Sequence, residues 1–344
     1  MQKKSTFVLA AMLLIFTHCF SQDKSTSGFK ILKEIKVPGD GHWDYCAFDS
    51  VNRHLFISHG TKVDVLDVDK GEVVGQIPNT NGVHGIAIAY DLNKGYTSNG
   101  KDSSVTEFDL KTFKTLKVIK IPGANPDCIL YDPFTQYVFT FNGKSKDATV
   151  IDAHYSTVAG KIDLGGKPEF AATNKKGNVY VNLEDKSVLV VIDAKAMKVF
   201  ARWDIKPGEE PSGLSYDETY DRLFIGCGNQ TMVVLNPYNG KVVQSYAIGD
   251  GVDATAFNHT TKTVFSSNGD ATLTIATQQN ANKYINIENI PTRKGARTMA
   301  VDTKLNRVYL PDASFGPAET KKDGTPGKPS IQPDSFVILV VGKE

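Results

Sequence analysis

The sequence predicts an all-β protein, a seven-bladed β-propeller with four antiparallel strands per blade. The prediction rests on a repeat of about 40 residues, on the lack of any long helical pattern, and on chain ends that complement each other. An aspartate or asparagine that follows a short apolar run recurs at intervals of 41 to 44 residues. These markers are Asp49, Asp91, Asp132, Asn174, Asp217, Asn258 and Asp302. Seven copies of such a unit predict a closed ring around a central channel.

Each repeat contains four short strand-like segments. In the first repeat these segments cover residues 43–48, 55–58, 63–67 and 73–77, and turn-forming Asp, Asn and Gly residues separate them. Short apolar or alternating runs between such turn signals are typical of antiparallel hairpins. We therefore expect each repeat to form one four-stranded blade.

The two ends of the chain are expected to share the last blade. The seventh repeat finishes at 336–341, which has the pattern of a third strand, and no fourth strand follows. Residues 29–37 have the pattern of a fourth strand, like residues 199–205 and 242–248. Pairing the N-terminal segment with the last repeat would close the ring and remove exposed sheet edges.

The N-terminus predicts a secretory signal peptide over residues 1–21. A basic start precedes an apolar run over 7–16, and small and polar residues follow. That run is too short to span a bilayer as a stable helix, although a membrane anchor or a lipoprotein signal at Cys19 is an alternative. We expect export to the periplasm or the cell exterior. Residues 22–344 would then form one domain, without a transmembrane segment.

Charge and cysteine content narrow the classes of partner. Without the signal peptide the chain has 37 basic and 38 acidic residues, so nucleic acid is not an expected partner. Cys46, Cys128 and Cys227 fall in different repeats and form no CxxC pair, so we expect buried thiols and no disulfide. A small molecule or an envelope protein is the expected partner, and a monomer is the expected state.

Several segments carry a family resemblance. Residues 179–182 read VYVN, a YVTN-type tetrad with one conservative change. The segments GHWDY, VHG, NPD, KPEF and GARTM, which lie at the starts of repeats one to four and seven, look like segments of the same family. From about residue 29 onward the chain resembles the YncE/YVTN-repeat family of exported bacterial β-propeller proteins. The resemblance implies the fold and export, but it implies no reaction, and we transfer no catalytic residue from it.

Polar residues are expected to converge at one mouth of the channel. In an antiparallel blade the inner strand begins beside the end of the second strand, so both sets of residues open on one face. The candidate ligand-binding residues are His42, Trp43, Asp44, His59, His84, Asp127, Glu169, Glu210, Asp253 and Arg297. An excess of carboxylates predicts a preference for a cationic or metal-bridged ligand. Solvated loop charges or inter-blade salt bridges are the alternative, and Trp43 is also expected to pack between blades.

Three Asn-Gly pairs receive a structural interpretation. The sequences Asn99-Gly100, Asn142-Gly143 and Asn268-Gly269 follow second strands and favour type I′ hairpin turns.

Residues 312–335 form an insertion rich in Pro and Gly in the seventh repeat. This insertion is either a lid across the mouth or a flexible excursion without a contact role.

Three functional hypotheses remain open. The first is an exported propeller that binds a small molecule or partner at the channel mouth, with no reaction assigned. The second is a metal-assisted hydrolase or lactonase at the same mouth, with His42, His84 and Asp44 as ligands of a divalent metal ion. Hydrogen-bonded structural histidines are the alternative for those residues. The third is a protein-interaction scaffold. The sequence identifies no catalytic residue, and it contains no P-loop, GxSxG or HExxH motif.

Overall fold

A computed structural model describes residues 27–39, 41–320 and 325–344. The predicted signal peptide therefore lies outside the described residues. Within the described ranges, no helix is both long and apolar enough to cross a membrane.

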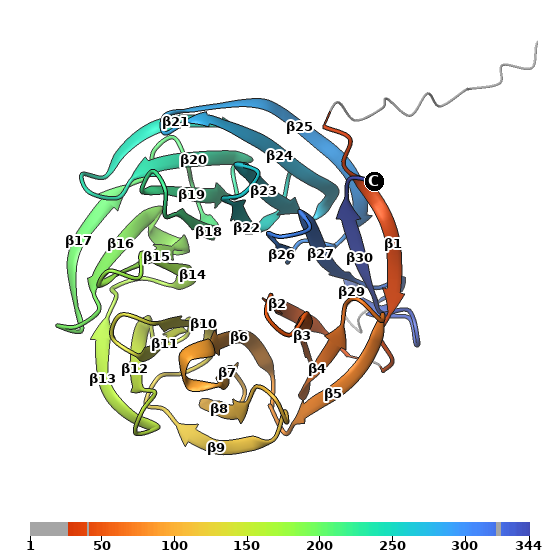
Figure 1. Cartoon of the computed structure of the whole chain (residues 1–344), viewed down its shortest axis with the longest axis horizontal. Coiled ribbons are helices and arrows are strands. Elements are labelled where there is room, and N and C mark those ends of the chain that lie inside the picture. Colours follow the sequence, from red (N-terminus) through yellow and green to blue (C-terminus); the bar gives the residue numbers. More distant parts are fainter. Residues whose placement is uncertain (1–26, 40, 321–324) are drawn as a thin grey trace, which may run out of the picture.

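Seven four-stranded antiparallel sheets form a ring around a central axis (Figure 1), which confirms the predicted fold. Blade 1 consists of β2 (Trp43–Asp49), β3 (His54–His59), β4 (Lys62–Asp67) and β5 (Glu72–Pro78). Blade 2 consists of β6 (Val83–Ala89), β7 (Lys94–Asn99), β8 (Ser104–Asp109) and β9 (Thr115–Lys120). Blade 3 consists of β10 (Pro126–Asp132), β11 (Tyr137–Asn142), β12 (Asp147–Asp152) and β13 (Thr157–Asp163).

The remaining blades follow the same order from the axis outward. Blade 4 consists of β14 (Pro168–Thr173), β15 (Asn178–Leu183), β16 (Val188–Asp193) and β17 (Lys198–Asp204). Blade 5 consists of β18 (Pro211–Asp217), β19 (Arg222–Cys227), β20 (Thr231–Asn236) and β21 (Lys241–Ala247). Blade 6 consists of β22 (Val252–Asn258), β23 (Thr263–Asn268), β24 (Asp270–Asn280) and β25 (Lys283–Lys294). Two short 3₁₀ turns, η1 (Tyr90–Leu92) and η2 (Glu184–Lys186), lie in hairpins of blades 2 and 4.

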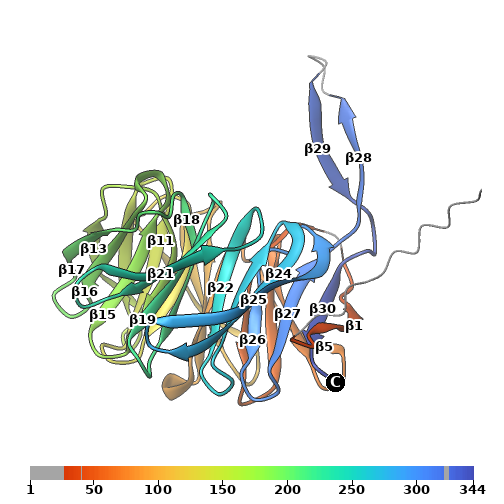
Figure 2. The same ribbon diagram turned by 90° about the horizontal axis from the view of Figure 1, so that it is seen from above.

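The seventh blade is assembled from both ends of the chain, as predicted. It consists of β26 (Ala300–Asp302), β27 (Arg307–Asp312), β30 (Val337–Gly342) and β1 (Lys30–Lys36). Strand β1 pairs antiparallel with β30 from Lys30 opposite Gly342 to Lys36 opposite Val337. Both views show β1 beside β30, so the ring is closed by this pairing (Figures 1 and 2).

The repeat markers cap turns. Asp49 ends β2, and its Oδ1 accepts hydrogen bonds from the backbone N–H groups of Val51 and Asn52, at 2.8 and 2.9 Å. Asn258 and Asp302 accept equivalent bonds in blades 6 and 7. A carboxylate or amide oxygen that satisfies turn N–H groups explains why Asp or Asn recurs at this position.

The blade 7 insertion is neither a lid nor an irregular excursion. It forms a two-stranded hairpin of β28 (Phe315–Thr320) and β29 (Pro326–Ile331). This hairpin projects away from the ring and does not lie across its mouth (Figure 2). Antiparallel pairing satisfies backbone groups that a flexible Pro/Gly loop would leave to water, which explains the correction.

Candidate functional site

The register of the blades confirms that two sets of residues meet at one mouth. The first residue of an inner strand pairs with the last residue of the second strand in five blades: Trp43 with His59, Val83 with Asn99, Pro126 with Asn142, Pro211 with Cys227 and Val252 with Asn268. Residues that begin inner strands therefore lie at the same end of the ring as residues that end second strands.

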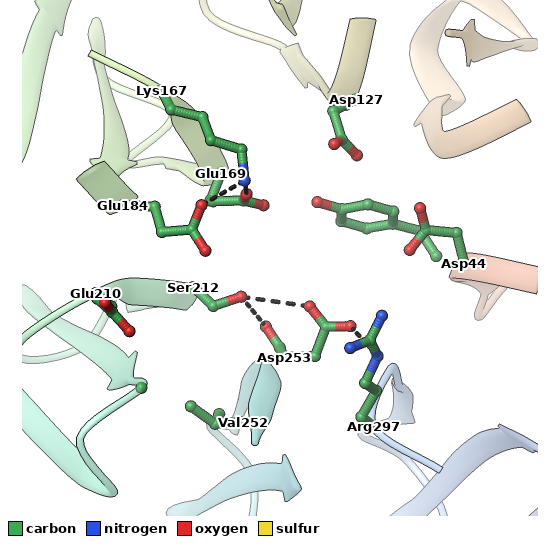
Figure 3. Close-up of a pocket in the computed structure, with 12 residues that line it drawn as sticks. Asp44, Asp127, Lys167, Glu169, Glu184, Glu210, Ser212, Val252, Asp253 and Arg297 are labelled. Atoms are coloured by element: carbon green, nitrogen blue, oxygen red, sulfur yellow. Dashed lines mark hydrogen bonds and ion pairs between the residues drawn. The ribbon is translucent and has the colours of Figure 1, made fainter. Parts of the chain in front are cut away.

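The starts of the inner strands enclose an acidic cup of about 320 Å³. Six carboxylates and two cationic side chains line this cup, which Figure 3 shows in close-up. The carboxylates are Asp44, Asp127, Glu169, Glu184, Glu210 and Asp253, and the cations are Lys167 and Arg297. The remaining lining residues are Tyr45, Ser212, Gly228 and Val252. Four of the cup's carboxylates, on blades 1, 3, 4 and 6, were predicted from the sequence, and the exposed Glu210 is a fifth.

Aromatic side chains meet across the axis at the wall of the cup. The ring of Tyr45, on β2, lies 4.6 Å from the ring of Phe170, on β14. These strands belong to blades 1 and 4, so the contact spans the channel. Tyr45 lines the cup and Phe170 does not, so this aromatic contact borders the cup on one side.

One wall of the cup is built around Glu169. The Lys167 ammonium lies 2.6 Å from Glu169 and also pairs with Glu184 (Figure 3). Burial raises the pKa of Glu169 to about 8, and the charge of Asp127 adds to this while Lys167 opposes it. The pKa of Glu169 therefore lies well above that of an ordinary glutamate.

A second wall is built around Asp253. Its Oδ2 lies 3.1 Å from Nε of Arg297, and the Ser212 hydroxyl donates to the backbone carbonyl of Asp253 at 3.0 Å (Figure 3). Burial raises the pKa of Asp253 to about 6, although the Arg297 charge opposes the shift. The alternative of an inter-blade salt bridge is thus correct for this pair, which nevertheless faces the cup.

The third wall is formed by Asp44 and Asp127, which flank His84, while His84 itself is not among the residues that line the cup or its neighbouring pocket. Nδ1 of His84 lies 2.6 Å from Asp44 Oδ2 and 3.7 Å from Asp127 Oδ1. Burial by itself would lower the pKa of His84, but the hydrogen bond to Asp44 and the charge of Asp127 raise it overall. Burial also raises the pKa of Asp127 to about 6.

This third wall also has the composition of a metal centre. One donor atom from each of Asp44, His84 and Asp127 lies within 4.8 Å of the others. Imidazole nitrogen with carboxylate oxygens suits first-row divalent metals. The predicted set of His42, His84 and Asp44 needs correction, because the third member of this group is Asp127. His42 is exposed and lines a neighbouring pocket.

That neighbouring pocket, here the aromatic pocket, measures about 550 Å³ and shares Asp44 and Arg297 with the cup. Its other lining residues are His42, Trp43, Gly269, Lys294, Gly295, Thr298, Phe315 and Pro329. Trp43 packs against Phe336 of blade 7, with ring centroids 5.1 Å apart, and it also faces the pocket. Both interpretations of Trp43 therefore apply.

His59 lines neither pocket. It is buried, its Nδ1 lies 2.7 Å from Asp64 Oδ2, and its ring packs 4.7 Å from the Phe336 ring. The side chain at the end of this second strand points into the blade, where it bonds to the next strand. His59 is therefore a buried structural histidine.

The asparagines at the ends of second strands behave like His59. Asn142 Nδ2 donates to Asp147 at 2.7 Å and to Thr149 at 3.1 Å. Asn99 and Asn268 make the corresponding bonds to the third strands of their own blades. Type I′ turns were the wrong prediction, since none of the three Asn-Gly pairs has a positive φ, which that turn requires.

Sequence reasoning missed Tyr45, Lys167 and Glu184 in the cup. Lys167 immediately precedes an inner strand, as His42 does, and this position could have identified it. Glu184 was hidden because Pro168 pairs with Leu183, one residue beyond Asn182. Asn182 instead donates to the carbonyl groups of Ser212 and Gly213 in the next blade.

Comparisons with known proteins support the fold and leave the family open. No protein-family model matches the chain. Antigen Lp49 of Leptospira interrogans serogroup Icterohaemorrhagiae serovar copenhageni (strain Fiocruz L1-130) is 30% identical over 121 residues, which make up 33% of this chain and 26% of that protein. The match thus spans about a quarter of the Leptospira protein.

Two solved structures share the architecture. A chain of the Kuenenia stuttgartiensis hydrazine synthase aligns with a TM-score of 0.68 and 15% identity, covering 80% of this chain and 94% of that one. A chain of a mitotic checkpoint complex aligns with a TM-score of 0.71 and 14% identity, covering 96% and 99%. At such identities the likeness shows the propeller fold alone.

Proposed function

We propose that this protein is an exported β-propeller whose acidic cup binds a small cationic molecule. The observation that carries the proposal is the excess of carboxylates in the cup, six against two cationic side chains. Export is proposed from the basic and apolar N-terminus and from the resemblance to the YncE/YVTN-repeat family.

The size of the cup favours a small molecule over a folded partner. A volume of about 320 Å³ lies at the lower end of the range for small-molecule pockets. A single side chain or a small organic cation would fill the space.

The electrostatics favour a positive charge in the ligand. Burial raises the pKa values of Asp127, Asp253 and Glu169. The negative charges of neighbouring carboxylates raise these pKa values further. A cation placed among them would allow these groups to ionise. Its N–H groups would also form charge-assisted hydrogen bonds with the carboxylate oxygens.

A thermal-shift screen tests the proposal. Primary amines and quaternary ammonium ions should raise the melting temperature, whereas carboxylates of matched size should not. Asp44→Asn should weaken amine binding by about tenfold, because it removes one charge in direct reach of the ligand. Glu72→Gln on the outer strand β5 is the matched control and should bind like the unaltered protein. Equal binding of amines and carboxylates would refute the proposal.

A second function, metal-assisted hydrolysis of an ester or lactone, is favoured by the grouping of Asp44, His84 and Asp127. These residues would hold a divalent metal ion, and such an ion supplies a Lewis acid when bound. Lys167 and Arg297 would orient an anionic part of a substrate. Metal analysis of the purified protein, beside His84→Ala and the exposed control His154→Ala, tests this function. Equal metal content in all three proteins would count against it.

A further inference from the structure

The aromatic pocket is continuous with the acidic cup. Asp44 and Arg297 line both spaces, so the two pockets adjoin at these side chains. The two spaces together form one composite site at the channel mouth.

Aromatic rings form one side of this pocket. The rings of Trp43 and Phe315 lie 6.0 Å apart at an interplanar angle of 42°. Pro329, on the second strand of the hairpin, lines the same space. Offset and tilted arrangements at this separation are the geometry in which aromatic groups attract one another, so the wall suits a flat ring.

The hairpin holds Phe315 at the pocket although its side chain is not buried. Phe315 is 43% exposed, and it is one of the residues that line the aromatic pocket. Directly before it, the N–H of Ser314 donates to the Ser335 hydroxyl at 3.1 Å, and the Ser314 carbonyl accepts from Gln332 N–H at 2.8 Å. These bonds close the base of the hairpin and fix the backbone directly before Phe315.

The charges of the two pockets differ and set the direction of a bound ligand. Lys294 and Arg297 line the aromatic pocket, with Asp44 at the boundary to the cup. An ammonium group is repelled by the two cations and attracted by the carboxylates of the cup. The cationic end of a ligand therefore belongs in the cup and its apolar end beside Trp43 and Phe315.

We propose that the aromatic pocket is a subsite for the aromatic portion of an amine whose ammonium group lies in the acidic cup. This inference rests on the proposed function and names its ligand class, an arylalkyl amine. The hairpin β28–β29 is then the element that adds recognition of the aromatic ring to a cup that recognises charge.

Phenethylamine and butylamine are the probes, because both carry one primary ammonium group and only the first carries a ring. The protein should bind phenethylamine about tenfold more tightly than butylamine, a factor typical of one well-placed aromatic contact. Phe315→Ala should remove this advantage and leave butylamine affinity unchanged. Phe315→Tyr should retain the advantage. Phe200→Ala, at an exposed aromatic position on the outer strand β17, is the matched control.

Trp43 provides an independent readout. The chain has two tryptophans, so in a Trp203→Phe background Trp43 is the sole tryptophan. Phenethylamine should change its emission, and butylamine should not. This measurement does not depend on any substitution within the site.

The outcomes separate the two proposals. If neither amine binds, the cation-binding function is wrong, and the aromatic subsite that depends on it is wrong as well. If both amines bind with equal affinity, or Phe315→Ala weakens both equally, the cation-binding function stands and the aromatic subsite is overturned. Selective loss of phenethylamine binding in Phe315→Ala supports both.

Discussion

Two sets of polar residues lie at the channel mouth, and they differ in the direction of their side chains and in their role. Side chains at the ends of second strands, such as Asn142 and His59, are buried and hydrogen-bonded within their own blade. Side chains at the starts of inner strands, such as Glu169 and Asp253, face the cup and have raised pKa values. The first set stabilises the blades, whereas the second set is crowded with like charge.

This difference separates stability from binding at one end of the ring. Satisfied polar groups at zero or near-zero exposure specify the fold, because each buried partner depends on the others. Crowded carboxylates raise the energy of the unliganded state, and a cation would lower it. Substitutions in the two sets should therefore have separable effects.

The largest effect is expected in the strand-end network. Asn142→Ala should lower the free energy of unfolding by about 3 kcal/mol, because it removes the donor to buried Thr149 and to Asp147 Oδ1, although Lys161 still pairs with Asp147 Oδ2. Urea denaturation measures this loss. Amine affinity at a temperature where the variant is folded should be unchanged, and a selective loss of binding would place Asn142 in the site after all.

The next effect concerns the pH dependence of binding. Lowering the pH from about 8 to about 5 should weaken butylamine binding by roughly tenfold, because Glu169 and Asp253 gain protons near pKa values of about 8 and about 6. Titration calorimetry across this range measures the change. Glu169→Gln should flatten the upper half of the curve, and a profile identical to that of the unaltered protein would contradict the assignment.

A smaller effect concerns stability without ligand. The folded-state pKa of Asp253 is about 6, above its ordinary value of 3.8, so the folded state holds a proton that the unfolded state has lost. The stability that this proton contributes is fully present below pH 3.8 and is lost as the pH rises from there to about 6. Asp253→Asn should remove this decline, which a shift from 3.8 to about 6 limits to at most about 3 kcal/mol, measured by urea denaturation at several pH values. A steeper decline in the variant would contradict the expected direction of the pH dependence that Asp253 gives to stability.

The smallest effect is expected in the hairpin. Phe315→Ala should change the free energy of unfolding by less than about 0.5 kcal/mol, because the side chain is substantially exposed. Thermal denaturation checks this expectation. A loss of several kcal/mol would make Phe315 a packing residue and remove the basis for its role in recognition.

The sequence predicted the fold because its signal is repeated. Asp49 and five of its six counterparts accept hydrogen bonds from N–H groups of the turn that follows, and the closing strand β1 has the same alternation as other outer strands. The channel mouth was predicted because antiparallel register follows from strand order.

Side-chain direction was harder to predict than position. His59 and Trp43 occupy paired positions, yet one points into the blade and the other reaches a pocket. Bulges near the start of most inner strands alter the alternation there, as between Trp43 and Cys46. The irregular register of blade 4 concealed Glu184, and the hairpin lies outside the repeat, so no period could predict its role.

The most direct test of the central claim is a crystal structure of the protein with butylamine at about pH 8. The account predicts the ammonium nitrogen within the cup, at hydrogen-bond distance from carboxylates on at least two of its three walls. An amine bound only outside the cup, or a cup that excludes it at concentrations that shift the melting temperature, would contradict the account.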